Sequence, residues 1–260
     1  MGNSVAKLAA LDIGIQLLAF LPSSYFKTER FYDLVGSSTF LCLGRLGLYF
    51  SQNTFRQKFQ ANPVSAWAIG LGLFIFYRFS NYGVNRRFDE VQGNPSVFLQ
   101  YWMLQGVWVF LTMLPFLLNN AIEDSLVPTT LDKLGWGMFR VGFLTEVIAD
   151  YQKFTFRKNP ENSGKFISHG LWSICRHPNL FGETLLCSGL TVTAFSSFKN
   201  WEWWSINILS FTCYLQTRVD EIPTLEQSEL NTCDNLSAYR DYIKTVPKLI
   251  PFPCKTLRWK

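Results

Sequence analysis

The chain has 260 residues and a net charge of +5, and charged and aromatic residues each make up 17% of it. This composition, poor in charge and rich in Phe and Trp, is typical of membrane proteins and argues against a soluble domain. The basic excess does not indicate nucleic-acid binding. Its Lys and Arg residues lie between apolar runs and in the tail, as expected for cytoplasmic loops and lipid headgroup contacts.

The first half of the sequence predicts four membrane-crossing helices, since one crossing needs about 20 mostly apolar residues. They cover residues 5–21, 34–50, 64–79 and 97–118. In the first of them, Asp12 and Gln16 share one helical face, which either points into a bundle or belongs to a helix lying in the membrane interface. The connecting segments are predicted as loops: a polar one at 51–62, a charged one at 81–95 and an acidic one at 119–132.

A fifth span, predicted from about residue 133 to 151, carries ionisable side chains that lipid would disfavour. Glu146 and Asp150 lie on one face of this helix, where like charges repel, so we expect a cation or a ligand between them. A basic loop is expected next. Two short apolar runs, 184–198 and 203–217, follow later and can form further spans.

The tail after residue 217 is polar, and one helix is expected in it at 237–245, capped by Ser237. Positive charge in the tail and after the third and fifth spans places these segments in the cytoplasm. We therefore expect an all-α, polytopic membrane helix bundle of about six to seven spans with a cofactor site at its cytoplasmic end, forming a single domain over residues 1–260. The six cysteines include no C-x-x-C pair and are expected to be reduced packing residues.

The segment 170–183 interrupts the apolar pattern with four polar side chains. They are Arg176, His177, Asn179 and Glu183. Pro178 cannot donate a backbone hydrogen bond and biases the residue before it away from helix, so we expect a break between two helices here.

This segment is expected to join other polar residues in a cluster at the cytoplasmic helix ends. Arg and Lys suit phosphates, Asn and Asp suit an adenine or amide edge, and Tyr stacks on flat rings, so the cluster suits a phosphate-bearing nucleotide. The alternative is mutual ion pairing that closes the helix ends, and residue types alone favour neither. The two histidines lack the Cys or acidic partners of a zinc site, so no metal is expected. The members are Arg86, Arg87, Asp89, Glu146, Asp150, Gln152, Lys153, Arg176, His177, Asn179 and Glu183, with Arg218, Asp220 and the tail tyrosines as weaker candidates.

The run Gly170-Leu171-Trp172, followed by Arg176-His177-Pro178-Asn179 and Phe181-Gly182-Glu183, resembles the signature of the steroid 5-alpha-reductase-like membrane proteins. Further motifs resemble the same group: Arg86-Arg87-Phe88-Asp89, Tyr101-Trp102-Met103-Leu104-Gln105-Gly106, Ala149-Asp150-Tyr151-Gln152-Lys153 and Tyr239-Arg240-Asp241-Tyr242. The resemblance is strongest over residues 44–253, with the signature within 146–190. Sterol C14 reductases and isoprenylcysteine carboxyl methyltransferases have related R-H-P segments. Two departures stand out: Leu180 replaces the usual Tyr, and Cys175 replaces Ser.

The resemblance implies a membrane reductase that uses NADPH to reduce a carbon–carbon double bond in a sterol-like or other lipid, in the endoplasmic reticulum if the source is eukaryotic. Glu146 is expected to relay a proton, because a carboxyl group within a span is costly to ionise. The alternatives are an S-adenosylmethionine-dependent membrane methyltransferase of the isoprenylcysteine type and a non-catalytic lipid-binding protein of the same fold. The resemblance places Arg87, Asp150, Gln152, Lys153, Arg176, His177, Asn179, Glu183, Tyr239 and Tyr242 at the cofactor site.

Overall fold

The computed structural model describes residues 2–82, 93–121, 127–195, 197–198, 221–233 and 236–251. Within these residues all regular structure is helical, which confirms the all-α prediction. The chain divides into two compact units, one made of Met1–Lys133 with Leu190–Ile208 and the other of Leu134–Gly189 with Leu209–Lys260. The prediction of a single domain stays a prediction.

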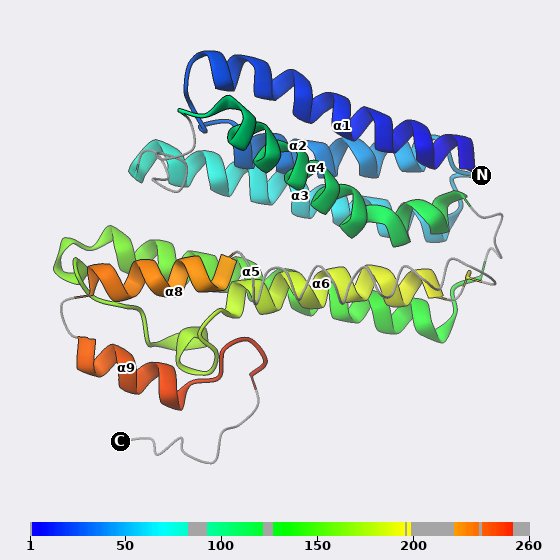
Figure 1. Cartoon of the computed structure of the whole chain (residues 1–260). Coiled ribbons are helices and arrows are strands. Elements are labelled where there is room, and N and C mark those ends of the chain that lie inside the picture. The colour runs from blue at the N-terminus through cyan, green and yellow to red at the C-terminus, as the bar shows by residue number, and fades with distance from the viewer. Residues whose placement is uncertain are drawn as a thin grey trace. The chain divides into compact units, whose positions relative to one another are not determined.

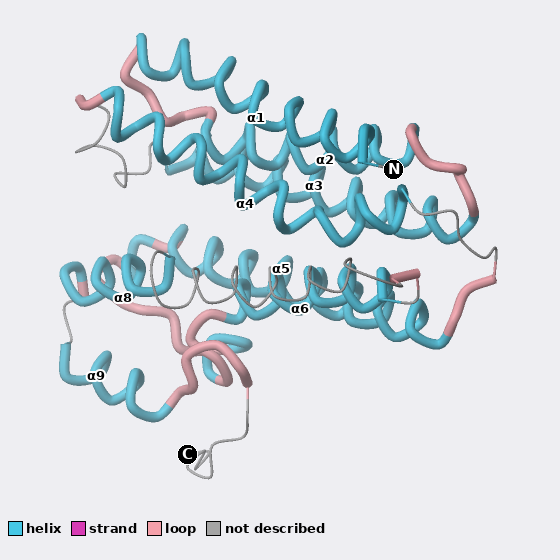
Figure 2. The backbone as a smooth tube through the Cα atoms, turned by 45° about the vertical axis from the view of Figure 1, so that its right-hand side comes forward, coloured by secondary structure: helices cyan, strands magenta, loops and turns pink. Residues whose placement is uncertain are grey.

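The first unit is built on four long helices, which run alongside one another in Figures 1 and 2. They are α1 (Gly2–Tyr25), α2 (Tyr32–Tyr49), α3 (Phe55–Tyr82) and α4 (Pro95–Ala121). Helix α2 packs against the other three, and α1 also packs against α4. Aromatic side chains pack in the interior. The centre of the Phe40 ring lies 4.9 Å from the centre of the Trp67 ring and 5.3 Å from that of the Trp108 ring.

Three helices in the described part of the chain are long and apolar enough to cross a membrane: Asn3–Tyr25, Phe55–Asn81 and Pro95–Ala121. They correspond to the predicted first, third and fourth spans. A membrane helix bundle is therefore confirmed, whereas the total of six to seven spans stays a prediction.

The polar face of α1 points into the first unit, as one of the two interpretations predicted. Asp12 and Gln16 are both 0% exposed. The Gln16 amide lies 3.4 Å from Asp12 Oδ1 and 3.4 Å from Thr39 Oγ1 of α2. Because α4 presents Gly106 at this level, the two side chains pack directly against its backbone.

The predicted loop at 51–62 is wrong, because α3 begins at Phe55 and continues through Pro63. Membrane helices tolerate an internal proline when other groups satisfy the freed backbone carbonyl. The polar residues of this first turn do not face water. Arg56 is 1% exposed, and its Nε lies 2.6 Å from Asp132 Oδ1.

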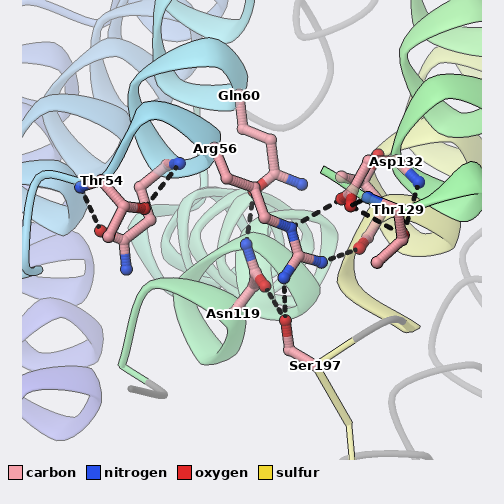
Figure 3. Close-up of polar contacts among 9 residues, drawn as sticks. Thr54, Arg56, Gln60, Asn119, Thr129, Asp132 and Ser197 are labelled. Carbon is pink, nitrogen blue, oxygen red and sulfur yellow. Dashed lines mark hydrogen bonds and ion pairs between the residues drawn. The ribbon is translucent and has the colours of Figure 1, made fainter. Parts of the chain in front are cut away.

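A network of polar side chains surrounds Arg56 in the first unit (Figure 3). Its Nη1 donates to Ser197 Oγ and its Nη2 donates to the Thr193 carbonyl, both at 2.7 Å. Ser197 in turn donates to Asn119 at 2.6 Å. The predicted acidic loop at 119–132 is wrong at both of its ends. Asn119 belongs to α4 and Asp132 to α5 (Thr130–Lys158), and both residues are buried.

The second unit contains most of α5 and of α6 (Pro178–Phe195). It also contains the short 3₁₀ helices η2 (Pro160–Asn162) and η3 (Gly170–Ser173), followed by α8 (Glu221–Thr232) and α9 (Leu236–Thr245). Helix α5 ends seven residues beyond the predicted end, so basic residues expected in a loop lie on its last turns. The predicted tail helix is confirmed as α9, but it begins at Leu236, so Ser237 lies in its first turn and the predicted cap is wrong. Helix α8 was not predicted, because its sequence has no strong apolar periodicity.

Helices α5 and α6 pack closely through glycines. A Cβ atom on Gly142 would lie 2.5 Å from the Gly182 carbonyl oxygen, and one on Gly189 would lie 2.5 Å from that of Gly135. These pairs are seven residues apart on each helix and run in opposite directions, so the two helices are antiparallel. This contact holds the last half of α5 beside the start of α6, where the signature segment ends.

Candidate functional site

The last turns of α5 support η3, the first part of the signature segment. Gln152 Oε1 accepts a hydrogen bond from the Leu171 backbone N–H at 3.0 Å. The Trp172 indole N–H donates to the Ala149 carbonyl at 3.1 Å. Gly170 has a φ of +61°, and a Cβ atom there would lie 2.5 Å from the Gln152 amide. Only glycine suits this position, since side chains disfavour the left-handed region and the amide occupies the space.

A cation lies over the buried tryptophan of η3. Lys153 Nζ is 4.8 Å from the centre of the Trp172 ring, and the Trp172 side chain packs with Ala149 and Ile167. Cation–π contacts of this kind favour a fixed position for the ammonium group. Lys153 is therefore a positive charge held on the signature segment.

The expected break between two helices is confirmed at residues 174–177, and Pro178 takes the first position of α6, where its missing N–H costs nothing. At this break Arg176 and His177 converge on one carboxylate oxygen of α8. Arg176 Nη1 lies 2.7 Å from Glu226 Oε1, and His177 Nε2 lies 3.2 Å from the same oxygen. Sequence reasoning missed Glu226, because no local spacing links residues that are 50 and 49 positions apart.

The protonation of this trio follows from burial and charge. Burial lowers the pKa of His177 below its ordinary value of 6.5, outweighing Glu226, which favours the charged imidazole. Burial alone would raise the pKa of Glu226, but the hydrogen bond from His177 and the charge of Arg176 hold it below its ordinary value of 4.5. At neutral pH the imidazole is thus neutral and the carboxylate charged, so His177 donates through Nε2–H.

Two atoms of the signature retain hydrogen-bonding capacity. Among the residues that the structure describes, neither Arg176 Nε nor His177 Nδ1 has a partner, and both atoms are buried. An unused buried donor and an unused buried acceptor in adjacent residues each carry a desolvation cost that a bound group can relieve.

Hydrogen bonds join the C-terminal segment to the signature. The Tyr242 hydroxyl donates to the Trp172 carbonyl at 2.6 Å, and the Arg176 backbone N–H donates to the Pro247 carbonyl at 3.0 Å. The Cys175 thiol donates to the Leu249 carbonyl at 2.8 Å. Burial raises the pKa of Cys175 to about 11, so this cysteine remains a thiol, in line with the packing role predicted for it.

Aromatic rings of α9 complete the site. The Phe166 ring lies 5.1 Å from each of the Tyr239 and Tyr242 rings. Burial raises the pKa of Tyr239 to about 12, so its phenol is neutral. The two tyrosines singled out in the sequence therefore lie in one aromatic cluster beside the signature.

Every described residue predicted for the site lies in the second unit. Glu146, Asp150, Gln152 and Lys153 are on α5, Arg176 and His177 precede α6, Asn179 and Glu183 are on α6, and Tyr239 and Tyr242 are on α9. Glu146 is 7% exposed, and Glu146, Asp150 and Glu183 all have interaction partners. Arg86, Arg87, Asp89, Arg218 and Asp220 lie outside the described residues.

Two arginines of the second unit pair with carboxylates of α8 that the predicted cluster did not include, so the mutual pairing of its members stays a prediction. Besides the Glu226 contacts, Arg157 Nη2 lies 2.8 Å from Glu229 Oε1, in a pair whose arginine side chain is 55% exposed. The Arg157 pair faces water, whereas the Arg176 pair is largely buried.

Comparison with known proteins finds similarity to a probable methyltransferase and to a sterol reductase. Similar proteins include a probable O-methyltransferase, ustE, of Ustilaginoidea virens, which is 40% identical over 60 residues, 23% of this chain and 21% of that protein. They also include a Delta(14)-sterol reductase of Arabidopsis thaliana, which is 24% identical over 160 residues, 57% of this chain and 38% of that protein. The chain thus spans well under half the length of these curated relatives. No solved structure matches it.

Residues 19–246 match a family described as "Protein of unknown function (DUF1295)". The match covers most of the chain, including α5, the signature segment, α8 and α9. The chain belongs to the DUF1295 family, and its resemblance to steroid 5-alpha-reductase-like membrane proteins is confirmed at the level of the family.

Proposed function

We propose that the chain is an NADPH-dependent reductase of a carbon–carbon double bond in a sterol-like or other lipid, acting within the membrane, which in a eukaryote would be that of the endoplasmic reticulum. One observation carries the proposal: the buried Nε of Arg176 is an unused donor, in the same unit as Lys153 and a group of aromatic rings. Similarity to a sterol reductase over 57% of the chain supports it.

The residues present fit the cofactor chemically. Lys153 and Arg176 provide the positive charge that phosphates require, and a guanidinium still has free N–H groups after pairing with Glu226. The rings of Phe166, Tyr239 and Tyr242 offer flat apolar surface for a base. Asn179, half-buried at the start of α6, brings an amide that can pair with a base or carboxamide edge.

The chain's own groups would bind and orient the cofactor and would protonate the substrate. NADPH supplies the hydride when it is bound. Glu146, almost fully buried on α5, is the proposed proton relay toward the reduced lipid. The η3 turn, held by Gln152 and Ala149, would keep the cationic groups in place, and α9 would cover them from water.

The second candidate is an S-adenosylmethionine-dependent methyltransferase, which the 40% identity to a probable O-methyltransferase over 60 residues favours. That methyl donor carries no phosphate, so it would make less use of Arg176 and Lys153. A non-catalytic lipid-binding protein is the third candidate, and the replacement of Tyr by Leu180 in the signature favours it.

Equilibrium binding of the purified protein to NADPH and to S-adenosylmethionine separates these candidates. We expect saturable binding of NADPH that weakens by at least about tenfold in Arg176→Ala and in Asn179→Ala, because each change removes a polar contact. Preferential binding of S-adenosylmethionine would support the methyltransferase instead. Binding of neither by a folded wild-type protein would rule out both enzymes.

A further inference from the structure

We propose that Glu226 is a positioning residue. It holds His177 in the tautomer protonated at Nε2, so that His177 Nδ1 accepts a hydrogen bond from an amide or hydroxyl donor of the bound cofactor. The tautomer follows from the geometry together with the burial of the ring, whereas the contact with the cofactor rests on the proposed function.

The geometry leaves one arrangement of protons for the neutral ring. Glu226 Oε1 lies 3.2 Å from His177 Nε2 and is 2.7 Å from Arg176 Nη1. A carboxylate that already accepts from a guanidinium is an acceptor, so Nε2 is the nitrogen that carries the proton. Nδ1 of the neutral ring then has a lone pair and no N–H.

Burial, with two cations nearby, keeps the ring neutral. Lys153 on α5 and Arg176 in the break disfavour a second proton on the imidazole, and Glu226 on α8 favours it. Lys248, from the segment after α9, offsets part of the Glu226 charge. With the ring buried and two cations acting on it, burial and repulsion outweigh the single carboxylate.

The Nδ1 lone pair has no donor in the described part of the chain. A buried acceptor without a partner loses its water and gains nothing in return. NADPH carries hydroxyl and carboxamide groups, both of which donate. A donor from the cofactor would satisfy Nδ1 without disturbing the contact between Nε2 and Glu226.

The tautomer is measurable directly, because the chain has two histidines. In His169→Gln, ¹⁵N-histidine labelling reports His177 alone, and solid-state NMR in lipid bilayers distinguishes protonated from unprotonated ring nitrogens. At neutral pH we expect a protonated Nε2 and an unprotonated Nδ1. A protonated Nδ1 would overturn the proposal, whether in the other neutral tautomer or in the imidazolium form.

Adding NADPH to the same sample tests the contact. We expect the Nδ1 resonance to shift toward the values of a hydrogen-bonded acceptor while Nε2 stays protonated. If NADPH binds and the Nδ1 resonance does not move, the contact is wrong and the proposed function stands. If NADPH does not bind, the proposed function fails and takes the contact with it, whereas the tautomer has been tested independently.

Variants of α8 separate positioning from simple folding. Glu226→Leu removes the acceptor, so we expect a mixture of His177 tautomers and NADPH binding weakened by at least about tenfold. Glu226→Gln keeps an oxygen acceptor and should retain the tautomer and most of the affinity. Glu229→Leu, one turn away, removes a carboxylate whose partner Arg157 is exposed, and should change neither. Equal loss of affinity in the two leucine variants would overturn the proposal.

Discussion

Two arginines, the fully buried Arg56 of the first unit and the half-buried Arg176 of the second, pair with a carboxylate in different ways. Arg56 Nε lies 2.6 Å from Asp132 Oδ1, and the two side chains are 2% and 0% exposed. The two terminal nitrogens of Arg56 donate to Ser197 and to the Thr193 carbonyl. Arg176 lies 2.7 Å from Glu226, with side chains 12% and 19% exposed, and its Nε has no partner in the described residues.

The difference separates a pair that holds helices from a pair suited to a ligand. A buried guanidinium whose Nε and two terminal nitrogens are all hydrogen-bonded, like that of Arg56, stabilises one arrangement of its helices and has no unused nitrogen for a ligand. The Arg176 pair keeps unused capacity at Nε and at the neighbouring His177 Nδ1, next to Lys153. We therefore expect the Arg56 network to stabilise the fold and, under the proposed function, the Arg176 site to bind the cofactor.

The largest effect is expected from breaking the Arg56 pair. Arg56→Met leaves Asp132 buried without its cation and should lower the free energy of unfolding by about 3–5 kcal/mol. Denaturant unfolding in detergent measures this loss. The double variant Arg56→Met/Asp132→Leu should recover most of it, because no charge is left buried. If the single variant were as stable as the wild type, the structural role of the network would be refuted.

The next largest effect distinguishes binding from stability at the Arg176 site. Arg176→Gln removes a charge-assisted contact worth about 1.5–3 kcal/mol, so NADPH affinity should fall by roughly 10- to 100-fold. Arg157→Gln is the matched control. It breaks an exposed pair, and its effect on stability should stay below about 1 kcal/mol with no change in affinity. Similar affinity losses in both would indicate a nonspecific effect of charge.

A smaller effect is expected at Leu180, one of the two positions where the signature departs from the family pattern. Leu180 is 3% exposed, so Leu180→Tyr places an aromatic ring and a hydroxyl in packed space. We expect a loss of about 1–3 kcal/mol in unfolding free energy from overpacking. Leu180→Phe separates the ring from the hydroxyl. If Leu180→Tyr raised NADPH affinity and Leu180→Phe did not, the missing hydroxyl would be a lost cofactor contact.

The smallest effect is a pH dependence of stability. The pKa of His177 in the folded protein lies below its ordinary value of 6.5, so the unfolded chain takes up a proton first as the pH falls. Stability should thus decline as the pH drops below about 6.5 and be level above it. The Glu226 contribution is present above the ordinary value of 4.5 and is lost below it. Thermal unfolding of wild type and His177→Gln between about pH 7 and pH 5 tests this, because the variant should show the flatter profile.

Much of the fold could be predicted from sequence because it depends on local patterns. Uncharged apolar runs identified α4 and most of α3, and Pro178 with the polar residues of the signature identified the break before α6. The loop assigned to 51–62 failed for a physical reason. Charge in a short segment predicts exposure, whereas the charge of Arg56 is neutralised by Asp132, which is 76 positions away in sequence.

The candidate site was predictable to the same extent. Its motif residues on α5 and in the signature are neighbours in sequence, and the η3 turn brings Gln152 to Leu171. Glu226 was out of reach, since α8 has neither a strong apolar periodicity nor a motif. Long-range pairing of charges is what the sequence does not encode in any local spacing.

The most direct test of the reductase is to follow the hydride itself. Membranes containing the protein would be given NADPH with deuterium at the transferable position. A parallel sample would be given S-adenosylmethionine with a deuterated methyl group. Mass spectrometry of the extracted lipids then shows which label has been transferred. We predict deuterium from NADPH in a lipid that has lost one double bond, and none in the Arg176→Gln sample. Transfer of the deuterated methyl group, with no deuterium from NADPH, would contradict a reductase.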